Sequence, residues 1–156
     1  MKSLILLIGL PASGKTTLIE AGFEDAVIVR PDDHIGYEDG GWTTHDAVIA
    51  WKKADEMFDE LLQSDEDTTV VFDAMFLSPK TRYKYIRKAK DAGVHVSAIF
   101  LDTPYSVCLA RNLSRPEYRK VPDDLMMKFA GLLQEPSKDE GFDFVSVVRF
   151  KKEESS

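Results

Sequence analysis

Short apolar runs alternate with segments of helical amphipathic pattern along most of the chain. Residues 4–8 are uninterrupted aliphatic residues, which is typical of a parallel strand buried on both faces. Further strands are predicted at residues 26–29, 68–72, 94–101 and 142–150. Between the runs, apolar side chains recur at helical spacing, most clearly over residues 44–63. This alternation predicts an α/β fold in which helices flank a parallel five-stranded sheet.

Residues with strong capping preferences mark the ends of the predicted helices. Residues 78–79, Ser followed by Pro, fit an N-cap and the first helical position, and Gly93 fits the C-terminal cap of the same helix. Residues 103–104, Thr followed by Pro, are expected to open another helix, with Asp102 capping the turn into it. A final helix is expected to begin at residues 122–124.

The composition is that of a soluble globular protein: 156 residues, 44% hydrophobic and 30% charged. We assign residues 1–150 to one domain and expect residues 151–156 to be a frayed tail. No apolar run approaches the ~20 residues of a membrane span, so we expect no membrane partner. Cys108 is the single cysteine, which excludes an internal disulfide and favours a reducing, cytoplasmic location. We expect Cys108 to be a small buried residue.

The net charge of −7 weighs against a protein coated with nucleic acid, although it allows one that grips only a strand end. Basic residues nevertheless gather at 80–90 and at 111–120. The first group falls on a predicted helix. For it we favour an ordinary solvated face over a track for a polyanionic acceptor.

Residues 9–16, Gly-Leu-Pro-Ala-Ser-Gly-Lys-Thr, fit the phosphate-binding pattern G-x-x-x-x-G-K-[ST]. They lie between a predicted buried strand and a predicted helix start, where backbone N–H groups and the positive end of the helix dipole converge. Lys15 would reach the β- and γ-phosphates of ATP, and the Thr16 hydroxyl would bind Mg²⁺. The predicted ATP-binding residues of this loop are Gly9, Pro11, Ala12, Ser13, Gly14, Lys15, Thr16 and Thr17.

Acidic residues follow the predicted strands at the edge of the sheet where this loop lies. Asp32 and Asp33 follow the second strand. One of them is expected to accept the proton of an attacking hydroxyl, and the alternative is a cap or a solvated loop acid. Asp73 ends the third strand. It would either orient the acceptor or a metal-bound water, or cap the following turn.

Arg111 and Arg115 are four residues apart, so on a helix they project from one face. Two guanidinium groups suit the charge that develops on a phosphoryl group in transfer, and the alternative is a solvated helix end. Tyr37 and Trp42 either stack on a nucleobase or anchor their glycine-rich loop.

Together these motifs resemble the kinase domain of phage-type polynucleotide 5′-kinases, over residues 2 to about 135. Residues 9–17 are similar to the family's phosphate-binding loop, and residues 31–33, Pro-Asp-Asp, to its R-D-D segment. Residues 72–82, from Phe-Asp-Ala to Pro79 and Arg82, resemble its D-x-N/T-x-x-P-x-x-R stretch. Residues 111–122, from Arg-Asn-Leu-Ser-Arg to Val-Pro, resemble its R-N-x-x-R…V-P lid, which we place at about residues 112–121.

The resemblance implies that Asp32 is the general base and that Arg111 and Arg115 clamp the donor phosphates. With Lys15, they are the expected catalytic residues. The residues implied on the substrate side are Asp32, Asp33, Asp73 and Arg82.

Two positions depart from the family on the acceptor side. Ile35 stands where the family has an arginine that contacts the acceptor's phosphate, a role that Arg30 could take instead. Met75 replaces the usual Asn or Thr.

The motifs and the resemblance together give the main hypothesis, an ATP-dependent kinase that phosphorylates the 5′-OH end of DNA or RNA. The alternatives are a kinase for a nucleoside, a modified base or another small molecule, and a non-catalytic nucleotide-binding module.

Overall fold

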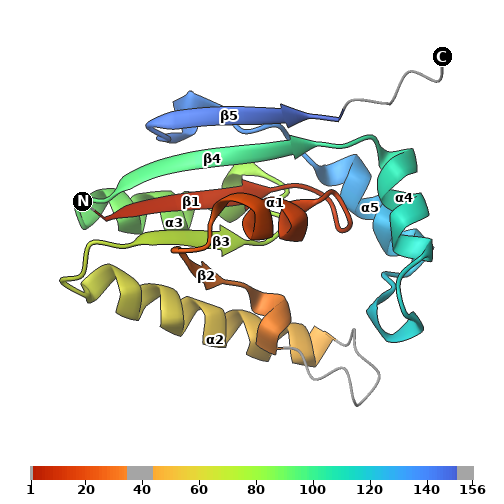
Figure 1. Cartoon of the computed structure of the whole chain (residues 1–156), viewed down its shortest axis with the longest axis horizontal. Helices are drawn as coiled ribbons and strands as arrows, with labels where there is room; N and C mark the ends of the chain where they lie inside the picture. Colours follow the sequence, from red (N-terminus) through yellow and green to blue (C-terminus); the bar gives the residue numbers. More distant parts are fainter. Residues whose placement is uncertain (1, 35–43, 151–156) are drawn as a thin grey trace.

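The computed structural model describes residues 2–34 and 44–150 and contains a parallel sheet with helices on both faces (Figure 1). Its strands lie in the order β2-β3-β1-β4-β5. The strands are β1 Ser3–Ile8, β2 Val27–Val29, β3 Thr69–Asp73, β4 His95–Asp102 and β5 Phe144–Arg149. The α-helices are α1 Lys15–Gly22, α2 Thr44–Gln63, α3 Pro79–Asp91, α4 Tyr105–Leu113 and α5 Asp123–Leu132. The 3-10 helices are η1 Pro31–His34, η3 Glu117–Arg119 and η4 Lys138–Glu140. The predicted α/β fold is confirmed.

Different helices cover the two faces of the sheet. On one face, Leu6 of β1 packs in a cluster with Phe58 of α2 and Ile86 of α3. On the other face, Leu7 packs with Ile19 of α1. Successive side chains of a strand point to opposite faces, so a central strand covered on both sides must be apolar at every position. This is the physical reason for the unbroken aliphatic run that precedes the phosphate-binding loop.

A third apolar cluster joins the phosphate-binding loop to the C-terminal half of the chain. Leu10 of the loop packs with Cys108 of α4, with Val121 and with Met126 of α5. Cys108 is fully buried, as predicted. Because α4 is anchored here, its last turn and the residues that follow are held beside the loop.

Helix α3 begins and ends where its capping residues predict. Ser78 forms a capping box with Thr81 at the N-terminus, and Gly93 has a positive φ of 73° just after the C-terminus. The basic face of this helix is largely exposed, as predicted, and two of its lysines also form ion pairs. Lys84 pairs with Asp55 and Lys88 with Asp59, both at 2.9 Å, so these lysines tie α3 to α2.

Asp102 does not cap α4, contrary to the prediction. Its carboxylate accepts a hydrogen bond from Arg149 Nη1 at 2.9 Å, and no side chain caps the start of α4. The two residues are register partners on the neighbouring strands β4 and β5, where opposite charges attract. Across residues 2–34 and 44–150, the structure has no helix with both the length and the apolar character needed to cross a membrane.

Candidate active site

A pocket of about 900 Å³ opens at the carboxyl edge of the sheet, beyond the end of the central strand β1. In an open parallel sheet this edge is where ligands bind. The pocket is lined by the phosphate-binding loop, by Arg30, Asp32 and Asp73 on one side, and by Arg111 and Arg115 on the other. The structure therefore brings the predicted donor loop, the predicted base and the predicted arginine pair into one cavity.

The backbone of the loop curls around a point in the pocket. Ala12 and Gly14 both have positive φ, 63° and 107°, and consecutive residues with such alternating conformations turn their N–H groups inward as an anion-binding nest. Gly9 is required by close approach, since a Cβ atom there would lie 2.7 Å from Ser13 Oγ. Ser13 Oγ is the one buried side-chain oxygen or nitrogen without a hydrogen-bond partner in the part of the chain that the structure describes. The nest itself fits a phosphate-bearing ligand.

Lys15 lies at the base of the pocket. Its ammonium donates to the carbonyl oxygens of Gly9 and Leu10, at 2.9 and 2.8 Å. Surrounding protein atoms shield the amine from water and lower its pKa to about 8, and the Asp73 and Asp32 carboxylates partly oppose this. The Asp73 and Asp32 carboxylates therefore do not fully compensate the Lys15 ammonium for its loss of water. The negative charge of a bound phosphate would stabilise it further.

Thr16 and Thr17 lie exposed in the first turn of α1, and both line the pocket. Thr103, after β4, was expected only to open a helix. Its hydroxyl donates to the carbonyl oxygen of Ser13 at 2.7 Å and so buttresses the loop from the neighbouring strand. Nothing in the sequence marks this role, because it depends on β4 lying next to β1.

Asp32 lies in η1, at the mouth of the pocket. Its carboxylate is exposed, yet the walls of the pocket withdraw enough water to raise its pKa. The Asp73 carboxylate raises that pKa further, while Lys15 lowers it. A raised pKa makes a carboxylate a better proton acceptor at neutral pH. Asp33 is also exposed but is absent from the pocket lining.

Asp73 is buried at the end of β3 and accepts a 2.7 Å hydrogen bond from Arg30 Nε. The partner of the Asp73 carboxylate is thus the Arg30 guanidinium, and both residues line the pocket. Arg30 Nη1 lies 3.5 Å from Asp33 Oδ1. Arg30 thus bridges two of the predicted acids and presents a guanidinium to the pocket. Ile35, Tyr37 and Trp42 lie outside the described residues.

The arginine pair approaches the loop from α4. Arg111 Nη1 donates to the carbonyl oxygen of Ala12 at 3.3 Å, and its guanidinium lies 5.7 Å from the centre of the Phe150 ring. Arg115 follows the end of α4, and its charge lowers the pKa of both Lys15 and Asp32. Arg115 lines the same pocket as these two groups.

Asn112 holds the segment from which Arg115 projects. Its amide is fully buried, donates to the Val121 carbonyl oxygen at 2.7 Å and accepts from the Val121 N–H at 2.9 Å. These two bonds hold the first and last residues of the predicted lid together. The sequence marks Asn112 only as part of the lid motif, and its spacing does not reveal the two hydrogen bonds to Val121.

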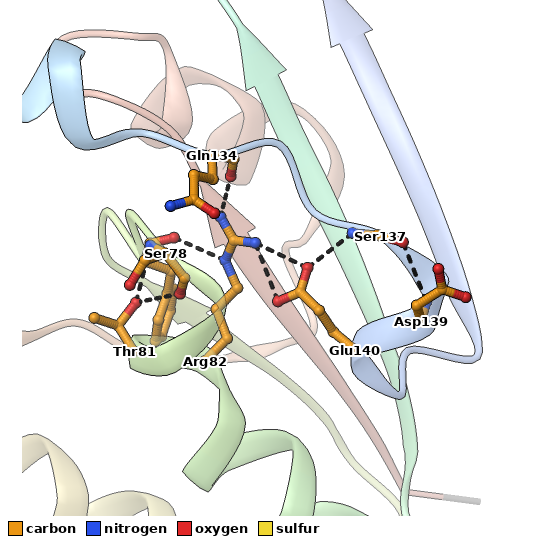
Figure 2. A network of polar contacts seen from close by, with 8 residues as sticks. Ser78, Thr81, Arg82, Gln134, Ser137, Asp139 and Glu140 are labelled. Carbon is orange, nitrogen blue, oxygen red and sulfur yellow. Dashed lines mark hydrogen bonds and ion pairs between the residues drawn. The ribbon is translucent and has the colours of Figure 1, made fainter.

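Arg82 is a correction to the sequence analysis. It was expected on the substrate side, but it is fully buried and does not line the pocket. Its guanidinium lies between Gln134 and Glu140, as Figure 2 shows, and donates to both. Trp51 is the converse case. It is one of the apolar residues at helical spacing in 44–63, and it lines the pocket while packing on Phe72.

The described residues contain no group of three or more His, Cys, Asp or Glu side chains placed to hold a metal ion.

The chain matches the model of a family described as an AAA domain, AAA_33, over residues 4–136. Solved structures share its fold. A gluconokinase from Sinorhizobium meliloti is 20% identical, with a TM-score of 0.66, covering 96% of this chain and 83% of that one. Chaetomium thermophilum Kti12 in complex with ADP-AlF3 is 14% identical, with a TM-score of 0.68 and coverage of 97% and 92%. The APS kinase CysC of Mycobacterium tuberculosis is 22% identical, with a TM-score of 0.57 and coverage of 94% and 88%. No curated protein sequence matches the chain.

Proposed function

Because the chain belongs to the AAA domain family AAA_33, with the fold of P-loop kinases, we propose that it transfers the γ-phosphoryl group of ATP to a hydroxyl of a small molecule. The observation that carries this proposal is the convergence of three features on one pocket. They are a phosphate-binding loop, a carboxylate of raised pKa and an arginine pair.

The donor side of the pocket fits ATP and Mg²⁺. The N–H groups of Ala12 and Gly14 would hold the phosphates, together with Lys15. The Thr16 hydroxyl would contribute to holding Mg²⁺, which when bound neutralises charge on the phosphate oxygens. Arg111 and Arg115 would stabilise the negative charge of the transferring phosphoryl group, and the segment at 112–121 would act as the lid that carries them.

Asp32 is the proposed general base. The acceptor hydroxyl gives its proton to the Asp32 carboxylate as its oxygen bonds to the γ-phosphorus, and the bond from that phosphorus to the bridging oxygen of ADP breaks. The Arg30–Asp73 ion pair would keep a second carboxylate beside Asp32 and so maintain its raised pKa.

The far side of the pocket supports a small-molecule acceptor. Ala47, Ala50 and Trp51 of α2, with Ala74 and Met75 after β3, line it with mostly apolar surface. Such a wall suits a compact organic body better than a polyanionic strand. The net charge of −7 has the same implication, and the solved structures of similar fold include a gluconokinase and an APS kinase. A polynucleotide 5′-OH end is the second candidate, favoured by the lid sequence and by the guanidinium of Arg30 in the pocket.

An acceptor panel with labelled ATP and Mg²⁺ tests the proposal. It should contain nucleosides, sugars, other small alcohols and oligonucleotides with 5′-OH ends. We expect transfer to at least one small molecule and none to oligonucleotides. Transfer only to oligonucleotide ends would establish the second candidate. Nucleotide binding without transfer to any acceptor would indicate a non-catalytic module.

Replacement of Asp32 tests the mechanism. Asp32→Asn keeps the shape of the side chain but removes the proton acceptor, so kcat should fall by about 10²–10⁴-fold. The affinity for ADP should stay within about threefold, because the donor side is untouched. Asp33→Asn is the matched comparison outside the pocket lining, and it should lower kcat by less than about tenfold. Near-normal turnover in Asp32→Asn would remove Asp32 as the base.

A further inference from the structure

Arg82 has no role in the proposed chemistry, yet it is among the largest fully buried side chains of the described residues. We propose that Arg82 is a positioning residue. It fixes the turn at residues 74–77, and through that turn it sets one wall of the pocket and the start of the phosphate-binding loop. The consequence for catalysis rests on the proposed function, whereas the positioning itself does not.

The guanidinium of Arg82 connects two segments that are far apart in the chain. Arg82 Nε donates to the carbonyl oxygen of Phe76 at 2.8 Å. Nη1 donates to both carboxylate oxygens of Glu140, at 3.1 and 2.9 Å, and Nη2 donates to the carbonyl oxygen of Gln134 (Figure 2). An arginine buried this deeply is tolerated only when its donors are satisfied, so the turn and the Gln134–Glu140 segment are held in one geometry.

The turn itself needs such support. Phe76 has a positive φ of 47°, which is an outlier for a bulky residue and persists only where the surroundings over-determine it. The Phe76 ring is buried against Phe72 and Tyr85, at centroid distances of 5.1 and 5.5 Å. Arg82 secures the carbonyl on the other side of the same residue.

The C-terminal segment reinforces the turn a second time. The Gln134 N–H donates to the Leu77 carbonyl oxygen at 2.7 Å, next to the carbonyl that Arg82 secures. Glu140 is itself held in place, because its carboxylate accepts from the Ser137 N–H at 2.8 Å. Arg82, Glu140 and Gln134 thus form one clamp across the turn.

The turn leads directly to the active pocket. The Gly9 N–H, at the first residue of the phosphate-binding loop, donates to the Met75 carbonyl oxygen at 3.3 Å. Ala74 and Met75 also line the pocket. A shift of the turn would therefore move both the acceptor wall and the entry to the loop, although Arg82 touches neither.

The Gly9 and Gln134 amides are natural reporters, because each donates to a carbonyl of the turn. In Arg82→Lys all three N–H donors radiate from one nitrogen and cannot reproduce the planar fork that spans Phe76, Gln134 and Glu140, so the turn should loosen. Amide hydrogen exchange followed by NMR should then become faster at both Gly9 and Gln134, by about tenfold or more, relative to Leu6 in the middle of β1. The Kd for Mg²⁺-ADP should rise by about three- to tenfold.

Val70→Ala is the matched control. Val70 is buried in β3 near the opposite end of that strand, so its truncation lowers the melting temperature without touching the turn. It should leave the exchange at Gly9, relative to Leu6, unchanged. Equal acceleration at Gly9 in Val70→Ala would overturn the proposal, because the effect would then be a general loosening of the fold.

Acceleration at Gln134 alone in Arg82→Lys would also overturn the proposal, since Arg82 would then only attach the C-terminal segment. If Arg82→Lys does not fold, Glu140→Gln replaces it under the same criteria. This variant removes the negative charge but keeps an oxygen that can accept from Arg82. Absence of phosphoryl transfer in the acceptor panel would defeat the proposed function while leaving the exchange result intact.

Discussion

At the scale of single residues, Lys15 is the group whose ionisation is most open to measurement. Its pKa is lowered to about 8, and phosphate oxygens beside it would favour the charged form. Nucleotide binding should therefore take up a proton when the pH is above about 8. We expect the affinity for Mg²⁺-ADP to fall by up to about tenfold per pH unit over that range. Titration calorimetry in buffers of different ionisation enthalpy measures both quantities.

Lys15→Arg is the control, because its guanidinium stays protonated throughout, so that any binding it retains should lose this pH dependence. An unchanged slope in the variant would assign the proton to another group.

The lowered pKa of Lys15 also determines how the stability of the ligand-free protein changes with pH. Folding disfavours the charged amine, so stability should rise with pH between about 8 and the ordinary value of 10.5.

At the scale of elements, the lid depends on Asn112. Asn112→Ala would remove both hydrogen bonds to Val121. The buried N–H and carbonyl groups of Val121 would then lack partners, at a cost of about 1–3 kcal/mol per group. The segment that carries Arg115 should loosen, so we expect both a lower melting temperature and a lower kcat. Thermal unfolding and steady-state kinetics check this. Ser114→Ala is the matched control, since its hydroxyl is exposed and donates only to Ala110.

The caps of α3 were more predictable than the contacts between elements. The caps at Ser78 and Gly93 follow from local chemistry that any helix obeys, and the sequence places both correctly. The Asp102–Arg149 pair and the ties from α3 to α2 depend on which elements are neighbours. A pattern within one segment carries no information about its neighbour, so these contacts were missed.

At the scale of the whole molecule, the same distinction explains the site. The phosphate-binding loop, Asp32 and Asp73 could be placed in one pocket because every strand of a parallel sheet ends at the same edge. Arg82 and Trp51 could not be assigned from spacing. Each lies on a helix that packs against the sheet, and this packing decides whether the side chain meets the core or the cavity.

A ligand that binds only this assembled pocket must stabilise the entire fold. With Mg²⁺-ADP at about 100 times its Kd, the stabilisation should be about 2.7 kcal/mol. For a chain of this size that corresponds to an increase in melting temperature of about 5–10 °C, growing with ligand concentration. Differential scanning calorimetry measures the shift. Lys15→Ala should abolish most of it, because the amine at the base of the pocket is lost. An equal shift in that variant would mean that the nucleotide binds elsewhere on the protein.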